Sequence, residues 1–356
     1  MPPRFAEALP TNWTIWLRRF ALALGIAYPV ALAVTMALFR FVGERWWASA
    51  AGLYVPRYAF VAPLPIVLIA LFTTGLRRAF WAVLAISVPL ALVMLGFVLP
   101  WFTGGNSGAP RIRVLSFNVN SGEAGTQPIF DVIDRYSPDI VFLQELAGAE
   151  PLATLLRARY PTVRTETQFL VASRFPITST LDPDKVEYNG RRRSPRWLEQ
   201  VIETPIGSIS FYNVHPISPR EGLVALRGNG LMREILSGRL LRGTNRETMQ
   251  TNAALRALQV ADFAEAAAAE KGPVVIAGDT NLPGLSYVFH HNLDDLQDAF
   301  TKAGWGFGYT FPTTRTPWMR IDRVLASDQL RFVHFEVGHS RVSDHNCVVA
   351  DLQLAE

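Results

Sequence analysis

Residues that could hold a metal ion and move protons stand at the ends of several short apolar runs. The runs 114–117, 140–144, 211–214 and 274–277 have the composition of buried strands, whose ends deliver side chains to one edge of a sheet. Carboxylate and amide oxygens bind hard cations, and imidazoles move protons near neutral pH. One site is therefore predicted from Asn118, Glu145, His215, Asp279, Asn281, Asp344 and His345.

The elements that must position these residues alternate between strands and helices along the last two-thirds of the chain. Residues 197–204 and 207–214 are predicted to form a hairpin with its turn near 205–207. Residues 248–270 form a long Ala-rich segment that predicts a helix. This alternation predicts an α/β fold in which two packed sheets are flanked by helices.

These segments resemble the endonuclease/exonuclease/phosphatase superfamily, the metal-dependent phosphohydrolases that include the DNase I type. The resemblance extends from Arg111 to about Glu356 and implies a four-layer α/β sandwich, two mixed sheets flanked by helices, with the site at one end. The matching motifs, in the family's order, are SFNVN (116–120), QE (144–145), NVHP (213–216), GDTN (278–281), RIDRV (320–324) and SDH (343–345).

The resemblance implies a set of metal ligands. Glu145 is the expected carboxylate ligand, Asn118 a ligand or ligand-orienting amide, and Asp344 a carboxylate on the metal or phosphate side. Mg²⁺ suits a site with one or two carboxylates and several waters, and Mn²⁺ is a realistic substitute. Asn120 stands where several relatives carry an acid, which leaves the number of bound metals open.

Acid–base roles follow from the same motifs. His345 is expected to be the general base or the partner of the attacking water, since an imidazole near its reference pKa of about 6.5 can do this at neutral pH. The resemblance pairs His345 with Asp322, which would fix its tautomer. It makes Asp279 the proton-handling aspartate and Asn281 a donor to a phosphoryl oxygen. His215 would contact the phosphate or assist the leaving group.

Several arginines lie close to these motifs. Arg191–Arg193 and Arg196 could grip a phosphate or an anionic headgroup, with a solvated loop as the alternative. Arg320 and Arg323 flank Asp322, and one of them is a candidate to reach the site.

The first third of the chain has a different composition. The runs 20–39, 58–76 and 79–102 contain no charged residue, and each approaches the ~20 residues that cross a bilayer core. They predict a membrane domain, 1–102, with about three transmembrane helices. A linker, 103–110, would join it to the catalytic domain, 111–356. Buried helices of a soluble protein and a cleaved signal peptide are the alternatives, and three successive runs disfavour both.

Charge gives an orientation and disfavours one function. The pairs Arg18–Arg19 and Arg77–Arg78 are the tightest basic pairs at span edges, so an integral cytoplasmic-membrane protein with an extracytoplasmic catalytic domain is expected. The net charge is +4, yet residues 1–110 hold 8 Lys and Arg against 2 Asp and Glu, a net +6. The catalytic part is therefore at −2, whereas a non-specific nuclease usually needs a basic surface.

The resemblance is closest to a membrane-anchored bacterial branch that includes teicoplanin-resistance-type proteins. It implies a phosphorylated lipid or another membrane-adjacent phosphoester as substrate, such as a polyprenyl pyrophosphate or a phospholipid. The alternatives are a membrane-tethered extracytoplasmic DNase-type nuclease, an enzyme for sugar or inositol phosphates, and a non-catalytic or sensory relative. Residues 220–242 have a basic amphipathic pattern, which predicts either an interfacial element or a surface helix packed on the domain.

Overall fold

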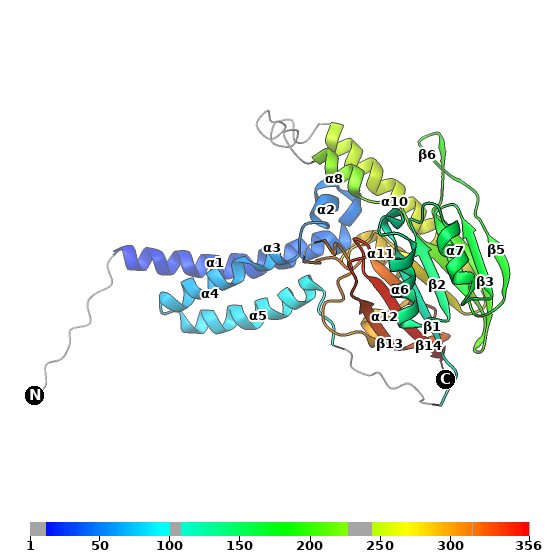
Figure 1. Cartoon of the computed structure of the whole chain (residues 1–356). Coiled ribbons are helices and arrows are strands. Elements are labelled where there is room, and N and C mark those ends of the chain that lie inside the picture. The colour runs from blue at the N-terminus through cyan, green and yellow to red at the C-terminus, as the bar shows by residue number, and fades with distance from the viewer. Residues whose placement is uncertain (1–11, 100–107, 227–243, 315, 356) are drawn as a thin grey trace, which may run out of the picture. The chain divides into compact units, whose positions relative to one another are not determined.

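A computed structural model of the protein describes residues 12–99, 108–226, 244–314 and 316–355 (Figure 1). The chain divides into two compact units. The first comprises Met1–Leu38 and Pro56–Gly96, and the second comprises Phe39–Val55 and Phe97–Glu356. A stretch of the expected membrane domain, residues 39–55, thus packs with the catalytic residues.

The described part of the first unit consists of helices and short connections. It contains most of α1 (Asn12–Phe41) together with α3 (Tyr58–Val61), α4 (Pro63–Thr73) and α5 (Arg77–Leu95). By length and composition, α1 and α5 are the two described helices that could cross a membrane, and the apolar segment 58–73 is shorter. The expectation of about three transmembrane helices therefore stays a prediction.

The packing of this unit leaves a large apolar surface uncovered. Ala21, Leu64, Val67, Leu71 and Val83 form a small buried cluster between the helices. Large apolar side chains on the same helices are mostly exposed, and they include Ile26, Val30, Val34, Ile66, Ile69, Phe72, Trp81 and Ile86. Contiguous apolar surface of this kind is rare on a monomer in water and is typical of a membrane or partner contact.

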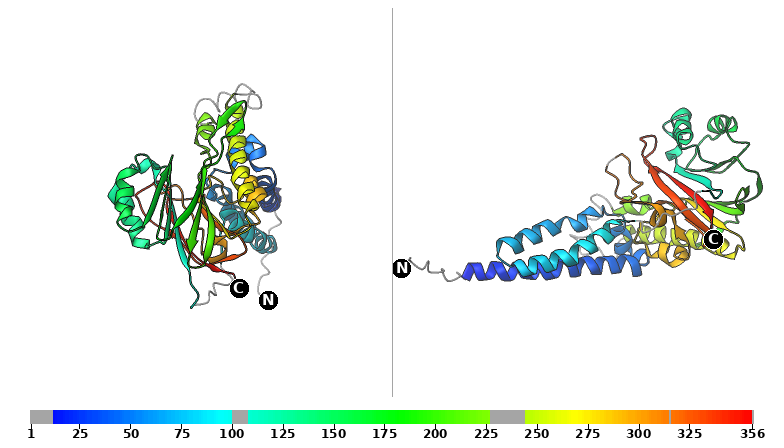
Figure 2. Two further views of the ribbon diagram at one scale, coloured as in Figure 1. Left: turned by 90° about the vertical axis from the view of Figure 1, so that its right-hand side faces the viewer. Right: turned by 90° about the horizontal axis from the view of Figure 1, so that it is seen from below.

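The second unit is built on two six-stranded sheets (Figure 2). The first sheet has the order β13-β14-β1-β2-β4-β3, from β1 (Ile112–Asn118), β2 (Ile140–Gln144), β3 (Thr162–Glu166), β4 (Phe169–Ser173), β13 (Leu330–Gly338) and β14 (Cys347–Leu354). The second has the order β11-β12-β10-β9-β8-β5, from β5 (Ile177–Leu181), β8 (Trp197–Thr204), β9 (Gly207–Val214), β10 (Val274–Asp279), β11 (Gln297–Asp298) and β12 (Asp322–Ala326).

Both sheets are mixed, as predicted. β1 pairs with β2 in parallel and β10 pairs with β9 in parallel, whereas the other pairs in the two sheets are antiparallel. The predicted hairpin is confirmed, because β8 and β9 pair from Trp197 with Val214 to Thr204 with Gly207. A separate two-stranded ribbon joins β6 (Val186–Tyr188) to β7 (Arg191–Arg193).

Three apolar layers hold the two sheets and their helices together. The inner layer lies between the sheets and includes Phe142 and Phe211, whose ring centroids are 5.6 Å apart. A second layer joins the first sheet to α6 (Thr126–Tyr136) and α7 (Glu150–Arg157). A third joins the second sheet to α10 (Thr244–Ala269) and α11 (Tyr287–Leu293). The short elements η2 (Asn120–Gly122), α8 (Arg220–Leu226) and α12 (Ala299–Ala303) complete the described part. Four layers therefore result, helix, sheet, sheet and helix.

The stretch 39–55 is built into the helical side of the second sheet. It contains η1 (Gly43–Arg45) and α2 (Trp47–Gly52). The buried Glu44 carboxylate accepts hydrogen bonds from the Ser286 hydroxyl and from the Val288 main-chain N–H at 3.1 Å. Tyr54, also buried, donates its hydroxyl to the Asn281 carbonyl at 2.8 Å. A buried carboxylate with two donors is satisfied only while this stretch stays in place.

The predicted amphipathic segment lies partly within the described structure. α8 is its first part and packs against α10. The rest, 227–242, lies outside the described residues, as does 103–107 of the expected linker. The interfacial role of the segment therefore remains a prediction.

Candidate active site

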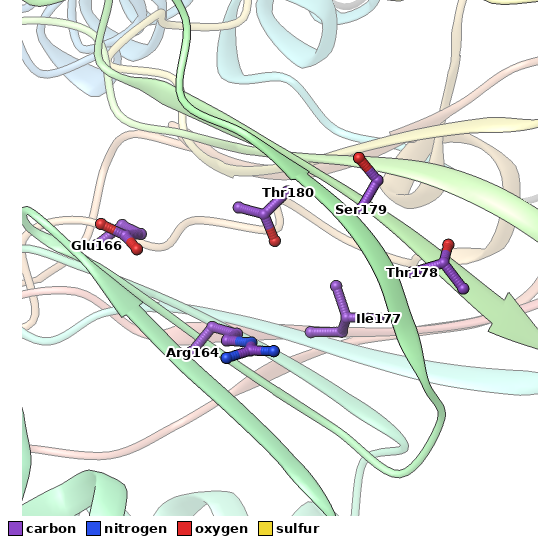
Figure 3. A pocket seen from close by; sticks show the side chains of 6 residues that line it. All are labelled: Arg164, Glu166, Ile177, Thr178, Ser179 and Thr180. Atoms are coloured by element: carbon purple, nitrogen blue, oxygen red, sulfur yellow. The ribbon is translucent and has the colours of Figure 1, made fainter.

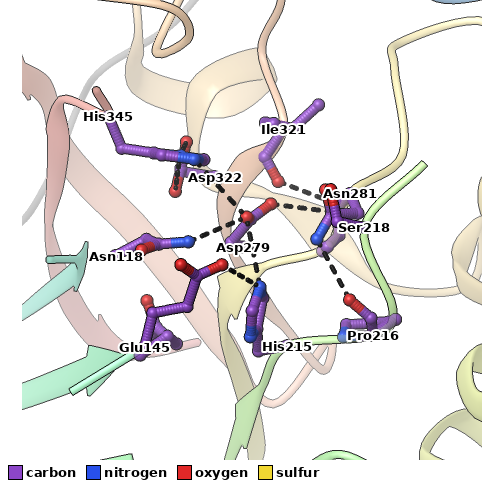
Figure 4. Close-up of polar contacts among 12 residues, drawn as sticks. Asn118, Glu145, His215, Pro216, Ser218, Asp279, Asn281, Ile321, Asp322 and His345 are labelled. Atoms are coloured by element: carbon purple, nitrogen blue, oxygen red, sulfur yellow. Dashed lines mark hydrogen bonds and ion pairs between the residues drawn. The ribbon is translucent and has the colours of Figure 1, made fainter. Parts of the chain in front are cut away.

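Strand topology gathers the predicted residues at one end of the two sheets. Parallel neighbours end at the same edge, which places Asn118 beside Gln144 and Gly278 beside Val214. Antiparallel neighbours begin at that edge, which places Asp322 opposite Asp279. The residues that follow or precede these strand ends are Glu145 after β2, His215 after β9 and His345 before β14. Figure 4 shows that these side chains point toward one another.

His345 and Asp322 form a buried pair. His345 Nδ1 lies 2.9 Å from Oδ2 and 3.1 Å from Oδ1 of Asp322. Burial acts to lower the pKa of His345, but the carboxylates of Asp322 and Asp279 outweigh burial and raise that pKa to about 10. The expectation of a His345 pKa near 6.5 is therefore not met in this arrangement, where the imidazole holds its proton at neutral pH.

Asp279 lies at the centre of the cluster and is almost completely buried. Its Oδ2 accepts a hydrogen bond from Asn118 Nδ2 at 3.1 Å, and its Oδ1 accepts one from the Asn281 main-chain N–H at 2.8 Å. Nε2 of His345 lies 3.7 Å from Oδ2 of Asp279. Burial raises the pKa of Asp279 to about 6, although the charge of His345 acts against that rise. Asp279 can thus exchange a proton close to neutral pH.

Glu145 is partly accessible, with 32% of its side chain exposed. Its backbone φ is +54°, an uncommon value for a residue other than glycine. Oε1 of Glu145 lies 3.0 Å from Nε2 of His215, and this interaction lowers the pKa of Glu145 to about 2 despite the opposing effect of burial. Gln168 Oε1 lies 2.8 Å from the other nitrogen of that imidazole. Glu145 is thus a fixed anion at the mouth of the site.

The donor set suits a divalent cation. Asp279, Asp322 and His345 offer ligand atoms that lie within 4.8 Å of one another, and all three are buried. Burial raises the pKa of Asp344, and the nearby charge of Glu145 adds to this rise. Crowded carboxylates of this kind are stabilised by a positive ion. Nε2 of His215 is buried and makes no hydrogen bond of acceptable geometry within the described structure, although Glu145 is 3.0 Å away.

Two groups of side chains could hold the cation. One is the buried triad of Asp279, Asp322 and His345, and the other is Glu145 and Asp344 with Asn118. The tight triad is already paired internally, since Asp322 binds His345 and Asp279 binds two amide groups. The half-exposed Glu145 and the half-buried Asp344, with Asn118 beside them, fit a hydrated cation better.

Buried polar residues beneath the site had no role assigned from the sequence. Gln144 Nε2 donates to Asn213 Oδ1 at 2.8 Å and to the Ser116 hydroxyl at 3.2 Å. Asn213 Nδ2 donates to the Leu143 carbonyl at 3.2 Å. The two bonds of Asn213 join the two sheets next to Glu145 and His215, and the bond to Ser116 ties Gln144 to its neighbouring strand. The signal was present, because Gln144 and Asn213 precede the two functional residues in the QE and NVHP motifs.

The arginines next to Asp322 do not serve the site. Arg320 and Arg323 both bind Asp298 Oδ2, at 2.6 and 2.7 Å, and Arg323 is buried. The prediction that one of them reaches the site is wrong in this structure, because both guanidinium groups form ion pairs with Asp298 on β11. Arg191–Arg193 form the exposed strand β7, whereas Arg196 is partly buried.

An open pocket adjoins the site. It has a volume of about 580 Å³ and is lined by Glu145, Gln168, Arg196, His215, Ile217, Ser218, Arg220, Glu221 and Val224. A second pocket, of about 310 Å³, is lined by β3 and β5 residues and contains none of the predicted site residues (Figure 3). Of these two pockets, the one beside Glu145 and His215 is therefore better placed to receive a substrate.

Comparisons with known proteins give one family match and several distantly similar structures. A model described as "Endonuclease/Exonuclease/phosphatase family" matches residues 115–345. An endonuclease/exonuclease/phosphatase structure from Beutenbergia cavernae DSM 12333 is 18% identical, with a TM-score of 0.48, 69% of this chain and 72% of that chain covered. The human Nocturnin catalytic domain is 18% identical, with a TM-score of 0.48 and coverage of 69% and 96%. A Bacteroides thetaiotaomicron mannosyl-6-phosphatase is 14% identical, with a TM-score of 0.47 and coverage of 68% and 99%. No curated protein matches the chain.

Proposed function

This chain belongs to the endonuclease/exonuclease/phosphatase family, and we propose that it is a membrane-anchored, metal-dependent phosphohydrolase that cleaves phosphate or pyrophosphate esters of lipid-linked substrates. Members of this family hydrolyse phosphoesters and depend on a divalent metal. The observation that carries the proposal is the joint presence of this acid and imidazole cluster and of two helices long and apolar enough to span a bilayer.

The proposed cation is Mg²⁺, held by Glu145 and Asp344 with the help of Asn118. When bound, such an ion neutralises charge on the phosphoryl oxygens and orients the phosphate. Mn²⁺ would serve in its place, since it also accepts oxygen ligands. The carboxylate count and the partly exposed Glu145 support a hydrated ion of this kind.

The chain's own residues supply the proton transfer. Asp279, with a pKa raised to about 6 by burial, is proposed to accept a proton from the attacking water. His345 keeps its proton through Asp322 and would donate a hydrogen bond to a phosphoryl oxygen as charge develops. His215 faces Glu145 and Asp279 through Nε2 and would assist the leaving group.

Asn281 uses one of its two side-chain N–H groups within the protein, which leaves the other for its predicted role. Its Nδ2 donates to the Pro216 carbonyl at 3.0 Å, and its side chain is buried. This bond ties the loop after β10 to the loop after β9. The amide keeps a second N–H, and we propose that this N–H is the donor to the phosphoryl oxygen.

The location proposed is the cytoplasmic membrane, with the catalytic unit outside. Arg18, Arg19, Arg77 and Arg78 support it through the tendency of basic residues to remain cytoplasmic. The apolar residues exposed on α1, α4 and α5 support the membrane itself. A lipid-linked substrate follows, because a site tethered near a bilayer meets headgroups at high effective concentration.

The test is a substrate panel on the full chain in detergent with Mg²⁺. The panel contains a prenyl monophosphate, a prenyl diphosphate, a phospholipid, a soluble sugar phosphate and duplex DNA. Hydrolysis of a lipid phosphate that disappears in Glu145→Gln supports the proposal. Glu145-dependent cleavage of DNA with no action on lipid phosphates would replace it with the tethered nuclease.

A further inference from the structure

Arg196 stands apart from the other arginines of the catalytic unit. Its φ is +61°, in the left-handed region that a residue with a Cβ rarely adopts. Its side chain is partly buried, and burial lowers its pKa while the Glu145 carboxylate acts in the opposite direction. Within the described structure, its guanidinium makes no hydrogen bond and no ion pair. Arg320 and Arg323, in contrast, are neutralised by Asp298.

The backbone around Arg196 is held firmly in this conformation. The Arg196 carbonyl accepts a hydrogen bond from the His215 main-chain N–H at 2.9 Å. Gln259 of α10 donates to the Ser194 carbonyl at 2.6 Å and accepts from the Ile217 main-chain N–H at 2.8 Å. The buried side chain of Gln259 therefore fixes the backbone next to Arg196 and the backbone at Ile217, and both of these residues line the 580 Å³ pocket. Strain that the surroundings maintain beside a reactive cluster is a mark of function.

The pocket suits a ligand with a charged part and an apolar part. Arg196 and Arg220 supply two cations, while Glu145 and Glu221 supply the two acids among its lining residues. Ile217 and the exposed Val224 supply an apolar wall. Glu145 belongs to the cluster where the scissile phosphate is expected. Arg196 lines the same pocket as Glu145, and an arginine can bind a second phosphate through two parallel N–H groups.

We propose that Arg196 binds a second anionic group of the substrate, the leaving-group phosphate of a diphosphate ester. This inference rests on the proposed phosphohydrolase function. In the reaction, the oxygen of water bonds to the terminal phosphorus while the bridging P–O bond breaks. The bond's electron pair leaves with the monophosphate ester, whose new charge Arg196 meets, and the proton from water goes to Asp279. The products are inorganic phosphate and the monophosphate ester.

The test uses the full chain in detergent with farnesyl diphosphate and farnesyl monophosphate. Arg196→Gly removes the guanidinium and also relieves the positive φ, so we expect no fall in melting temperature. We expect kcat/KM on the diphosphate to fall at least tenfold further than on the monophosphate. Arg196→Lys, which keeps the charge but loses the paired N–H groups, should show an intermediate selective loss.

The matched control is Arg135→Gln, because Arg135 is exposed on α6, which packs on the outer face of the first sheet. It should leave both substrates unaffected, which excludes a general effect of losing one positive charge. An equal loss on the two substrates in Arg196→Gly, or a lower melting temperature with the loss, would overturn the inference. Wild-type protein that hydrolyses neither substrate would instead refute the proposed function.

Discussion

His345 Nδ1 lies 2.9 Å from Asp322 Oδ2, and the two residues come from different sheets. Asp322 begins β12 of the second sheet, and His345 precedes β14 of the first. The same is true of the Asn118–Asp279 hydrogen bond and of the Glu145–His215 contact. Each of these pairs therefore exists only while the two sheets stay packed. A substitution that loosens the core between the sheets should also disturb the geometry of the active site.

Replacing Asp322 by Asn should remove the main orienting partner of His345. The pKa of His345, which Asp322 helps to raise to about 10, should fall. We expect kcat to drop about 10- to 100-fold, as it does when a residue that orients a functional histidine is lost. The alkaline limb of the pH–rate profile should move to lower pH. The profile of kcat against pH is the measurement, and an unchanged profile would show that the pair has no catalytic role.

The stability of the metal-free protein should decrease above neutral pH. The folded state raises the pKa of His345 from 6.5 to about 10. Protonated His345 therefore stabilises the fold fully below about pH 6.5, and this contribution is lost as the pH approaches 10. Asp279, whose folded pKa is about 6, changes its protonation mainly below pH 6.5, so it contributes little to the pH dependence between pH 6.5 and 10. Melting temperatures in EDTA should fall more steeply for the wild type than for His345→Gln between pH 6.5 and 10. Parallel curves would contradict the raised pKa.

Glu145→Gln keeps the shape of the side chain and removes its charge. We expect more than about a hundredfold loss of hydrolysis with little change in melting temperature, since Glu145 is partly exposed and serves the proposed cation. EDTA should abolish wild-type activity, and Mg²⁺ should restore it. Glu166→Gln, an exposed acid on β3, is the control and should remain active. Full activity of the Glu145 variant in EDTA would exclude the proposed metal site.

Tyr54→Phe should affect both stability and catalysis. It removes the buried hydroxyl that binds the Asn281 carbonyl, at a cost of about 1 kcal/mol. Tyr160→Phe is a matched control, because the Tyr160 hydroxyl binds the Pro138 carbonyl at 3.0 Å on the far face of the first sheet. Both variants should lose similar stability in urea unfolding, but kcat should fall only in the first. Equal kcat values would mean that Tyr54 supports the fold without positioning Asn281.

The proposed topology places the C-terminus outside the cytoplasm. A reporter that is active only outside the cytoplasm should be active when it is fused to the C-terminus. A reporter that is active only inside should be silent there. The reverse pattern would invert the orientation that the pairs Arg18–Arg19 and Arg77–Arg78 predict.

The sequence was sufficient to predict which residues the fold brings together wherever a strand pattern and a motif coincide. Asn118, Asp279 and Asp322 lie at strand ends, and sheet topology alone brings strand ends together. The pairing of Arg323 with Asp298 could not be predicted, because it depends on how β11 lies against β12. The raised pKa of His345 depends on burial and on distances to two carboxylates, which no spacing in the chain reveals.

The place of residues 39–55 has a consequence for how the protein is made and whether its catalytic part can be released. These residues are synthesised long before Asn281, Ser286 and Val288, which they hold in the finished protein. In the proposed membrane topology they must therefore reach the same side of the membrane as the catalytic unit before the last third of that unit is made. A protease that cut the chain between 103 and 107 would not liberate an intact enzyme, because the partners of these three residues would remain on the other fragment.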